Sequence, residues 1–202
     1  MPSPRQSLRT AGVAVRAMAV LTVILGVGYT AVVTGIGQLA LPAQADGSLA
    51  TVDGEVVGSS LIGQSFADAD GAASPEWFQS RPSAAGDGYD ASASSGSNLG
   101  PENEDLVSAI EERRAAIAAS DGVDPQTIPA DALTASASGL DPHISPEYAR
   151  LQVARVASAR GIPVQEVERL VDQHVQGRDL GYLGEPTVNV LQLNIALAGL
   201  GG

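Results

Sequence analysis

Histidine is the first residue type to test for catalysis, and the sequence holds only two, His143 and His174. They lie far apart along the chain, and neither belongs to an H-x-x-x-H pair or another spacing typical of zinc ligands. His143 follows Asp141-Pro142 and precedes an expected helix start, so we expect a hydrogen-bonded structural residue. His174 falls late in an expected helix, where interaction with the helix dipole is favoured over catalysis.

Other catalytic residue types are missing or scattered. All 11 basic residues are arginine, which excludes the lysine of a G-x-x-x-x-G-K phosphate-binding loop. No G-x-S-x-G nucleophile elbow occurs, and the segment 58–62 only approaches one. Cysteine is absent, which excludes a disulfide framework and a thiolate metal site. The sequence therefore predicts no catalytic residue, no bound cofactor and no metal site, and we expect a chain that is not an enzyme alone.

Charge is sharply divided along the chain. The only charged residues before Ala17 are three arginines, Arg5, Arg9 and Arg16. From Asp46 onward, eight arginines stand against all 23 acidic residues, which gives this part a net charge of −15. Such a polyanionic domain repels phosphate backbones, so we expect no nucleic-acid binding. Its field could enrich potassium locally, but screening over about 8 Å makes this a minor effect.

A membrane anchor separates the two charged parts. Residues 17–41 carry no charge and are rich in Val, Leu, Ile, Ala and Gly, long enough as a helix to cross a bilayer. The arginines before this stretch place the N-terminus in the cytoplasm. We therefore expect a cytoplasmic segment (1–16), a transmembrane helix (17–41) and an extracytoplasmic soluble domain (42–202) in the cell membrane.

A cleaved signal peptide is the alternative to a retained anchor. Ala43-Gln44-Ala45 has the small-x-small form of a cleavage site. The apolar stretch is longer than the roughly 7–15 residues of a signal-peptide core, which favours the retained anchor. Both interpretations place the remainder outside the cytoplasm.

The outer part reads as a small α+β domain. Residues 48–66 are strand-like, with Asp53-Gly54 favouring a hairpin turn. Residues 67–100 have the composition of a long loop, which isolated aromatic residues would pin to the domain. Caps and apolar spacing predict helices over 101–122, 145–161, 163–177 and, with the weakest pattern, 188–197.

Five strings are too specific to arise from composition. They are GSSLIGQSF (58–66), WFQSRPSA (77–84), SGSNLGP (95–101), TASASGLDPHISP (134–146) and GEPTVNVLQLN (184–194). In this order, after one membrane span, they closely resemble the C subunits (KdpC) of bacterial Kdp-type potassium-transporting ATPases. The resemblance covers nearly the whole chain. Small departures at Ser95 and Ala137 exchange one small residue for another.

The resemblance implies a place in a four-component potassium uptake pump. Its partners would be a channel-like potassium-translocating subunit, a P-type ATPase subunit that forms an aspartyl phosphate, and a small membrane subunit. The C subunit is implied to be needed for assembly and activity. It is further implied to act as a catalytic chaperone that raises the ATP affinity of the ATPase subunit.

The composition and expected location of the outer domain argue against direct binding of ATP. The expected outer domain is acidic, lacks lysine and faces away from cytoplasmic ATP. A direct ATP-binding regulator of the pump remains the alternative function. A secreted hydrolase is a third one and would require cleavage after Ala45.

Candidate partner-contact or motif residues come from these strings. Arg81 and Asn98 are expected either to contact a partner or to fix the loop, and Asp141 and His143 to form a turn and cap. Asn189 and Asn194 are expected to cap the last helix. The full candidate set is Gln64, Phe66, Arg81, Pro82, Ser83, Ser97, Asn98, Asp141, His143 and Asn189.

Overall fold

The computed structural model describes residues 4–68 and 71–200. Parts of two expected segments, the N-terminal residues 1–16 and the loop 67–100, therefore lie outside the described residues. The chain divides after Ser48 into two compact units. Each unit is described separately.

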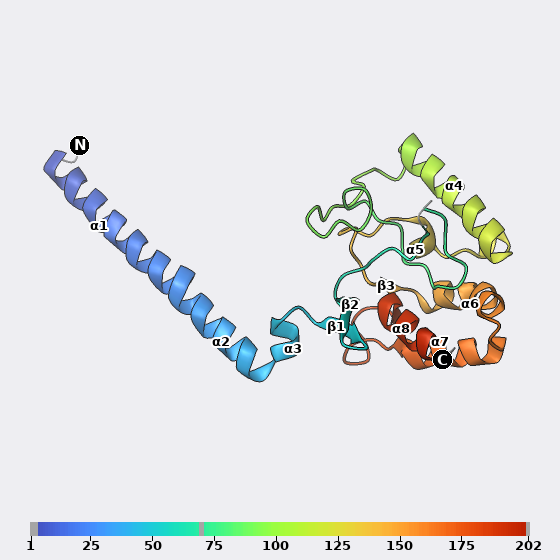
Figure 1. The fold of residues 1–202 in the computed structure, drawn as a ribbon. Coiled ribbons are helices and arrows are strands. Elements are labelled where there is room, and N and C mark those ends of the chain that lie inside the picture. Colours follow the sequence, from blue (N-terminus) through green and yellow to red (C-terminus); the bar gives the residue numbers. More distant parts are fainter. Residues whose placement is uncertain (1–3, 69–70, 201–202) are drawn as a thin grey trace. The chain divides into compact units, whose positions relative to one another are not determined.

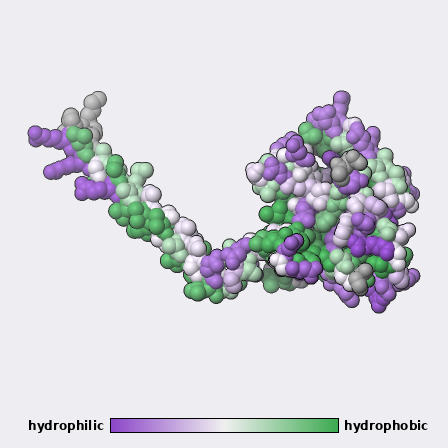
Figure 2. Space-filling view, viewed as in Figure 1, coloured by the Kyte–Doolittle hydropathy of each residue, from purple (hydrophilic) through white to green (hydrophobic). Residues whose placement is uncertain are grey.

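The first unit is a long apolar helix (Figure 1). Its parts are α1 (Pro4–Thr22), a π-helical stretch (Val23–Tyr29) and α2 (Thr30–Ala40). The 33 residues Leu8–Ala40 form the one helix among the described residues that is long and apolar enough to cross a membrane. Figure 2 shows a mostly hydrophobic surface along this helix, with hydrophilic side chains at its N-terminal end.

The long helix ends at Leu41, directly before a proline. Leu41 leaves the helical region, with φ −139° and ψ 55°. A residue before proline is driven out of the α region by contact with the proline ring, which explains this position. One short helical turn follows, α3 (Pro42–Ala45).

The second unit begins with the predicted hairpin, which is confirmed. Strands β1 (Leu49–Val52) and β2 (Glu55–Ser59) pair antiparallel, with Val52 opposite Glu55. Asp53 and Gly54 both have positive φ values, 51° and 86°. Two positive φ values define a type I′ turn, whose twist matches that of paired strands.

The long loop is also confirmed. Between Ser59 and Glu104 the described residues contain neither a helix nor a named strand. An isolated bridge between Ala67 and Ala73 interrupts this loop. The loop is held to the domain as expected, since Phe78 is completely buried in the core.

The predicted helices are present, and their ends follow standard caps. They are α4 (Glu104–Asp121), α6 (Pro146–Arg160), α7 (Val164–His174) and α8 (Val190–Leu200). Two short turns lie between α4 and α6, a 3-10 turn (Pro125–Thr127) and α5 (Ala130–Leu133). Asn103 accepts backbone N–H bonds at the start of α4, while Gly122 and Gly161 end α4 and α6 in the left-handed conformation.

A small antiparallel sheet was missed by the sequence reading. Strands β3 (His143–Ile144), β4 (Val175–Gln176) and β5 (Thr187–Asn189) form it in the order β3-β5-β4. The prediction was wrong in continuing α7 to residue 177 and in starting the last helix at residue 188. Strands of two or three residues are too short to display an alternating pattern. The fold class is nevertheless the predicted α+β.

The core lies where α6, α7 and α8 meet this sheet (Figure 1). Its completely buried side chains are mostly aliphatic, since the chain has few aromatic residues. Burial of each contributes about 1.5–3 kcal/mol. The largest apolar ones are Phe78, Ile144, Leu193, Leu197, Val156, Val167, Val171, Val188 and Val190.

Candidate functional site

The five motif strings come together in the folded domain. Gly63 donates its N–H to the Leu140 carbonyl at 2.8 Å, and Ser95 donates its N–H to the Ser138 carbonyl at 2.9 Å. The Ser83 hydroxyl donates to the Gly139 carbonyl at 2.6 Å. The strings 58–66, 77–84 and 95–101 are therefore all bonded to the 134–146 string. The last string joins through Asn189, whose side-chain amide donates to the Ser60 carbonyl at 2.8 Å.

At one position in this junction, two backbone segments pack so closely that only glycine fits. A Cβ placed on Gly63 would lie 2.5 Å from the Asp141 carbonyl oxygen. The obstacle is backbone rather than a flexible side chain, so the loop would have to separate from the 134–146 string. Gly63 therefore sets how closely these two segments pack.

Arg81 and Asp141 form an ion pair at the junction. The Arg81 Nη1 atom lies 3.0 Å from Asp141 Oδ2, and the two side chains are 23% and 30% exposed. Asp141 Oδ1 also accepts the His143 N–H at 3.0 Å, which is the expected turn. Burial raises the pKa of Asp141, but hydrogen bonds from His143 and the charges of Arg81 and His143 outweigh it and hold the pKa below its usual value. The carboxylate is thus kept ionised to tie two loops together.

Tyr89 is hydrogen-bonded to the loop segment that contains Arg81. Its hydroxyl donates to the Arg81 carbonyl, and its N–H donates to the Ser83 hydroxyl at 2.8 Å. Burial raises the pKa of Tyr89 to about 12, against opposing contributions from a hydrogen bond with Ser80 and the charge of Arg81. Arg81 Nε is buried and has no hydrogen-bond partner among the described residues.

Two side-chain amides pair with the loop backbone as a neighbouring strand would. Asn194 accepts the Phe78 N–H and donates to the Phe78 carbonyl, both at 2.9 Å. Gln152 accepts the Gln79 N–H at 2.7 Å and donates to the Gln79 carbonyl at 3.2 Å. Both amides are buried, so these bonds replace those that water would make.

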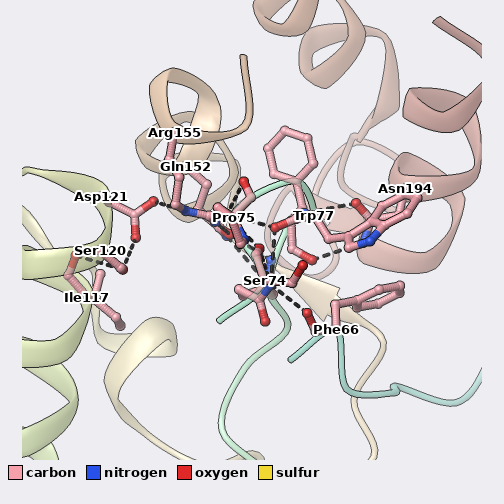
Figure 3. Close-up of polar contacts among 12 residues, drawn as sticks. Phe66, Ser74, Pro75, Trp77, Ile117, Ser120, Asp121, Gln152, Arg155 and Asn194 are labelled. Carbon is pink, nitrogen blue, oxygen red and sulfur yellow. Dashed lines mark hydrogen bonds and ion pairs between the residues drawn. The ribbon is translucent and has the colours of Figure 1, made fainter. Parts of the chain in front are cut away.

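Arg155 binds the part of the same loop that directly precedes Phe78 (Figure 3). It forms an ion pair with Asp121 at 2.8 Å, in which the side chains are only 6% and 5% exposed. Its remaining donors reach Gln152 Oε1 at 2.7 Å and three loop carbonyls, those of Ser74, Pro75 and Trp77. A buried pair of this kind costs about 3–5 kcal/mol to break on one side. It stabilises the loop against both α4 and α6.

The remaining candidate residues have local roles or lie at the surface. Phe66 packs 6.5 Å from Trp77, between ring centroids, and the Gln64 carbonyl accepts the Ser80 hydroxyl. Pro82 is half-buried, whereas Ser97 and Asn98 are exposed. Asn98 donates to the Gly96 carbonyl at 3.1 Å within its own turn.

The two expected caps of the last helix have different outcomes. Asn189 Oδ1 accepts the Gln192 N–H at 3.1 Å, which confirms it as a cap of α8. The expectation for Asn194 was wrong, because this residue lies inside α8 and binds the Phe78 backbone.

The sequence did not predict the structural roles of Gln79, Gln152 and Arg155, whereas Tyr89 is one of the isolated aromatic residues that were expected to hold the long loop. One signal was available for Gln152, which directly precedes Val153 and shares a helix face with Ala149 and Val156. A polar residue on an apolar helix face needs a buried partner.

Neither histidine is part of a catalytic arrangement in the described residues. His143 Nδ1 lies 3.5 Å from Asp141 Oδ1, and His174 Nδ1 donates to the Leu170 carbonyl at 2.8 Å. Residues 4–68 and 71–200 contain no group of three or more His, Cys, Asp or Glu residues able to hold a metal ion. The polar residues described above bind loop backbone and each other.

The chain is thus of the class that joins an apolar helix, long and apolar enough to cross a membrane, to a small α+β domain. Within this class, the chain belongs to the family KdpC, described as the K+-transporting ATPase c chain, which matches residues 11–199. This finding confirms the resemblance seen in the five strings.

Several potassium-transporting ATPase KdpC subunits are similar over most of their length. The one from Kineococcus radiotolerans is 58% identical over 190 residues, which cover 94% of this chain and 93% of the relative. The one from Beijerinckia indica is 56% identical and covers 87% and 86%. The one from Mycobacterium tuberculosis is 52% identical and covers 88% and 92%.

The Asn194 pairing predicts a large stability loss on truncation. Asn194→Ala leaves the buried N–H and carbonyl of Phe78 without partners, at about 1–3 kcal/mol each. We expect the free energy of unfolding to fall by about 2–6 kcal/mol in urea denaturation of the full chain in detergent. Trp77 is the only tryptophan and reports on this loop directly. The exposed Gln192→Ala on the same helix is the control, and equal losses in both variants would contradict the assignment.

Tyr89 predicts a specific dependence on alkaline pH. Its pKa is raised from 10 to about 12, so its contribution to stability is complete below pH 10 and is lost as the pH rises towards 12. At pH 8, Tyr89→Phe should be less stable by about 1 kcal/mol, because it lacks the bond to the Arg81 carbonyl. Above pH 10 the difference from the wild type should shrink.

The chain has no lysine or cysteine to titrate in this range, and its three other tyrosines are common to the wild type and Tyr89→Phe. Urea denaturation at steps from pH 8 to pH 12 checks it, with the exposed Tyr182→Phe as the control. Parallel stability curves for wild type and Tyr89→Phe would show that the hydroxyl is not protected in the folded state.

Proposed function

We propose that the chain is an accessory, non-catalytic subunit of an ATP-driven potassium uptake pump. The observation that carries this proposal is its membership, over nearly the whole chain, in the family of K+-transporting ATPase c chains. Its partners would be a channel-like potassium-translocating subunit, a P-type ATPase subunit and a small membrane subunit. The chain would be needed for their assembly and activity.

The proposed topology has one membrane span with the domain outside. Arg5, Arg9 and Arg16 precede the apolar stretch, and a net charge of −15 follows it. Positive residues stay on the cytoplasmic side during insertion. The proposed limits are a cytoplasmic segment (1–16), a span (17–41) and an extracytoplasmic domain (42–202). The helix Leu8–Ala40 supports this proposal, since it covers all of the proposed span except Leu41.

We further propose that the chain raises the ATP affinity of the ATPase subunit without binding nucleotide itself. A surface hollow of about 440 Å³ at the start of α6 has one cation in its lining, Arg150, together with Glu147 and Glu185. Arg150 is already paired with Asp172 at 3.0 Å. Two carboxylates beside a neutralised arginine disfavour a triphosphate. The effect on ATP would therefore pass through the partner subunits.

Copurification tests the proposed role. The full chain, tagged at its C-terminus and purified from its native membranes in mild detergent, should bring the channel-like and P-type ATPase subunits with it. Removing the chain from the pump should raise the ATP concentration needed for half-maximal ATPase activity. The purified full chain should show no saturable binding of labelled ATP at cellular concentrations. Saturable binding would establish the direct ATP-binding regulator instead, and absence of both subunits would refute the proposed role.

Trypsin tests the topology, because it cleaves this lysine-free chain only after arginine. Arg178 lies in an exposed segment and its side chain is 45% exposed. In intact right-side-out vesicles we expect trypsin to remove a C-terminal tag and leave an N-terminal tag protected. A C-terminal tag that becomes sensitive only after the vesicles are opened would reverse the orientation. Loss of the N-terminal tag from the mature membrane protein would indicate a cleaved signal peptide.

A further inference from the structure

An apolar groove lies between the hairpin, the long loop and α8. It has a volume of about 220 Å³. Carbon-rich side chains form most of its lining, chiefly Val52, Val57, Phe66, Trp77, Leu191 and Ile195. The polar residues in the lining are Gln64 and Asn194, and Asn194 is already bonded to the Phe78 backbone. The groove is therefore suited to an uncharged, apolar occupant.

Further apolar side chains are exposed on the hairpin and in the segment just after it. Leu49, Val56 and Leu61 are 56%, 59% and 61% exposed. Figure 2 shows hydrophobic surface at the β1–β2 hairpin, while the rest of this face is a mixture of hydrophilic and hydrophobic surface. Contiguous exposed apolar surface on a soluble domain is typical of an interaction site.

The walls of the groove are fixed by contacts described above. Asn189 binds the Ser60 carbonyl just after the hairpin, and Asn194 binds Phe78 beside Trp77. A Cβ placed on Gly58 would lie 2.9 Å from Leu191 Cδ2, so the hairpin packs closely on α8. A groove with such walls is preformed, and a partner does not have to order it on binding.

Several occupants are disfavoured by size and charge. Small-molecule sites usually measure about 300–1,000 Å³, and this smaller groove has no charged residue in its lining to hold a nucleotide. An anionic lipid surface is opposed by Asp53 and Glu55 at the hairpin tip. A second copy of this chain would bring together two domains of −15 charge each. The favoured occupant is an apolar residue of a less acidic protein.

The chain between the proposed span and the hairpin is short. Leu49 follows Leu41 by eight residues, which span at most about 28 Å even when fully extended. In the proposed topology the groove lies on the outer side of the membrane, which is also the side of the outer segments of the other subunits.

We infer that this groove receives an apolar side chain from an outer segment of another subunit of the same pump. Basic residues should flank that side chain and face the acidic hairpin tip. The inference rests on the proposed function and specifies the surface through which the outer domain joins the complex.

Site-specific photo-crosslinking tests the inference in the full chain in its native membrane. A benzophenone amino acid replaces Val57, which is 37% exposed at the groove. The matched control replaces Val107 on α4, which is 43% exposed and is not part of the groove lining. The Val57 probe should crosslink to an identified pump subunit, at least about ten times more than the Val107 probe. Crosslinks to lipid alone, to a second copy of this chain, or equally from both positions would overturn the inference.

Filling the groove gives a second readout. Ala198→Phe places a ring in the groove, whereas Gln192→Phe adds the same ring at an exposed position of α8 that does not line it. Both variants should keep the Trp77 unfolding transition of the wild type. With the Val57 probe in place, Ala198→Phe should lower the amount of crosslinked pump subunit at least about tenfold. Gln192→Phe should leave that amount at the level of the wild type. If the pump subunits copurify but the Val57 probe does not crosslink to them, or Ala198→Phe leaves the crosslink unchanged, the groove inference fails while the proposed function stands.

Discussion

The domain depends on how its long loop satisfies its backbone hydrogen bonds. The described residues between Ser59 and Glu104 form no helix or named strand, yet Phe78 and Ala85 in this loop are completely buried. Buried backbone N–H and carbonyl groups must be paired, and this loop has no neighbouring strand that supplies a full ladder. Side chains from the helices supply the missing partners. Asn194 and Gln152 each bond one residue in both directions, and Arg155 binds three carbonyls.

This arrangement explains why polar residues are prominent in the motif strings. Asp141 is held ionised by His143 and Arg81, where it joins the 77–84 and 134–146 strings. Asn189 caps α8 and at the same time binds the end of the hairpin. These residues use their hydrogen bonds and ion pairs to position backbone segments. The result is a fixed frame that presents an apolar groove beside the hairpin.

The sequence predicted the elements that have strong local signals. The type I′ turn follows from Asp53-Gly54, and helix starts follow from residues such as Ser145-Pro146. The small sheet was missed, because its strands are only two or three residues long and are defined by pairing between distant segments. The site was only partly predictable. Arg81, Asp141 and Asn189 were identified through the resemblance. Gln152 and Arg155 were not, because their buried partners are far away in sequence.

Native-state hydrogen exchange tests most directly whether side chains hold the buried loop. The amides of Phe78 and Gln79 should exchange only with the unfolding of the domain, because Asn194 and Gln152 accept them in the interior. The exposed Asp87, in the same loop, should exchange many times faster. If the Phe78 and Gln79 amides instead exchange as fast as that of Asp87, the loop is not held by these side chains and the frame described above does not exist.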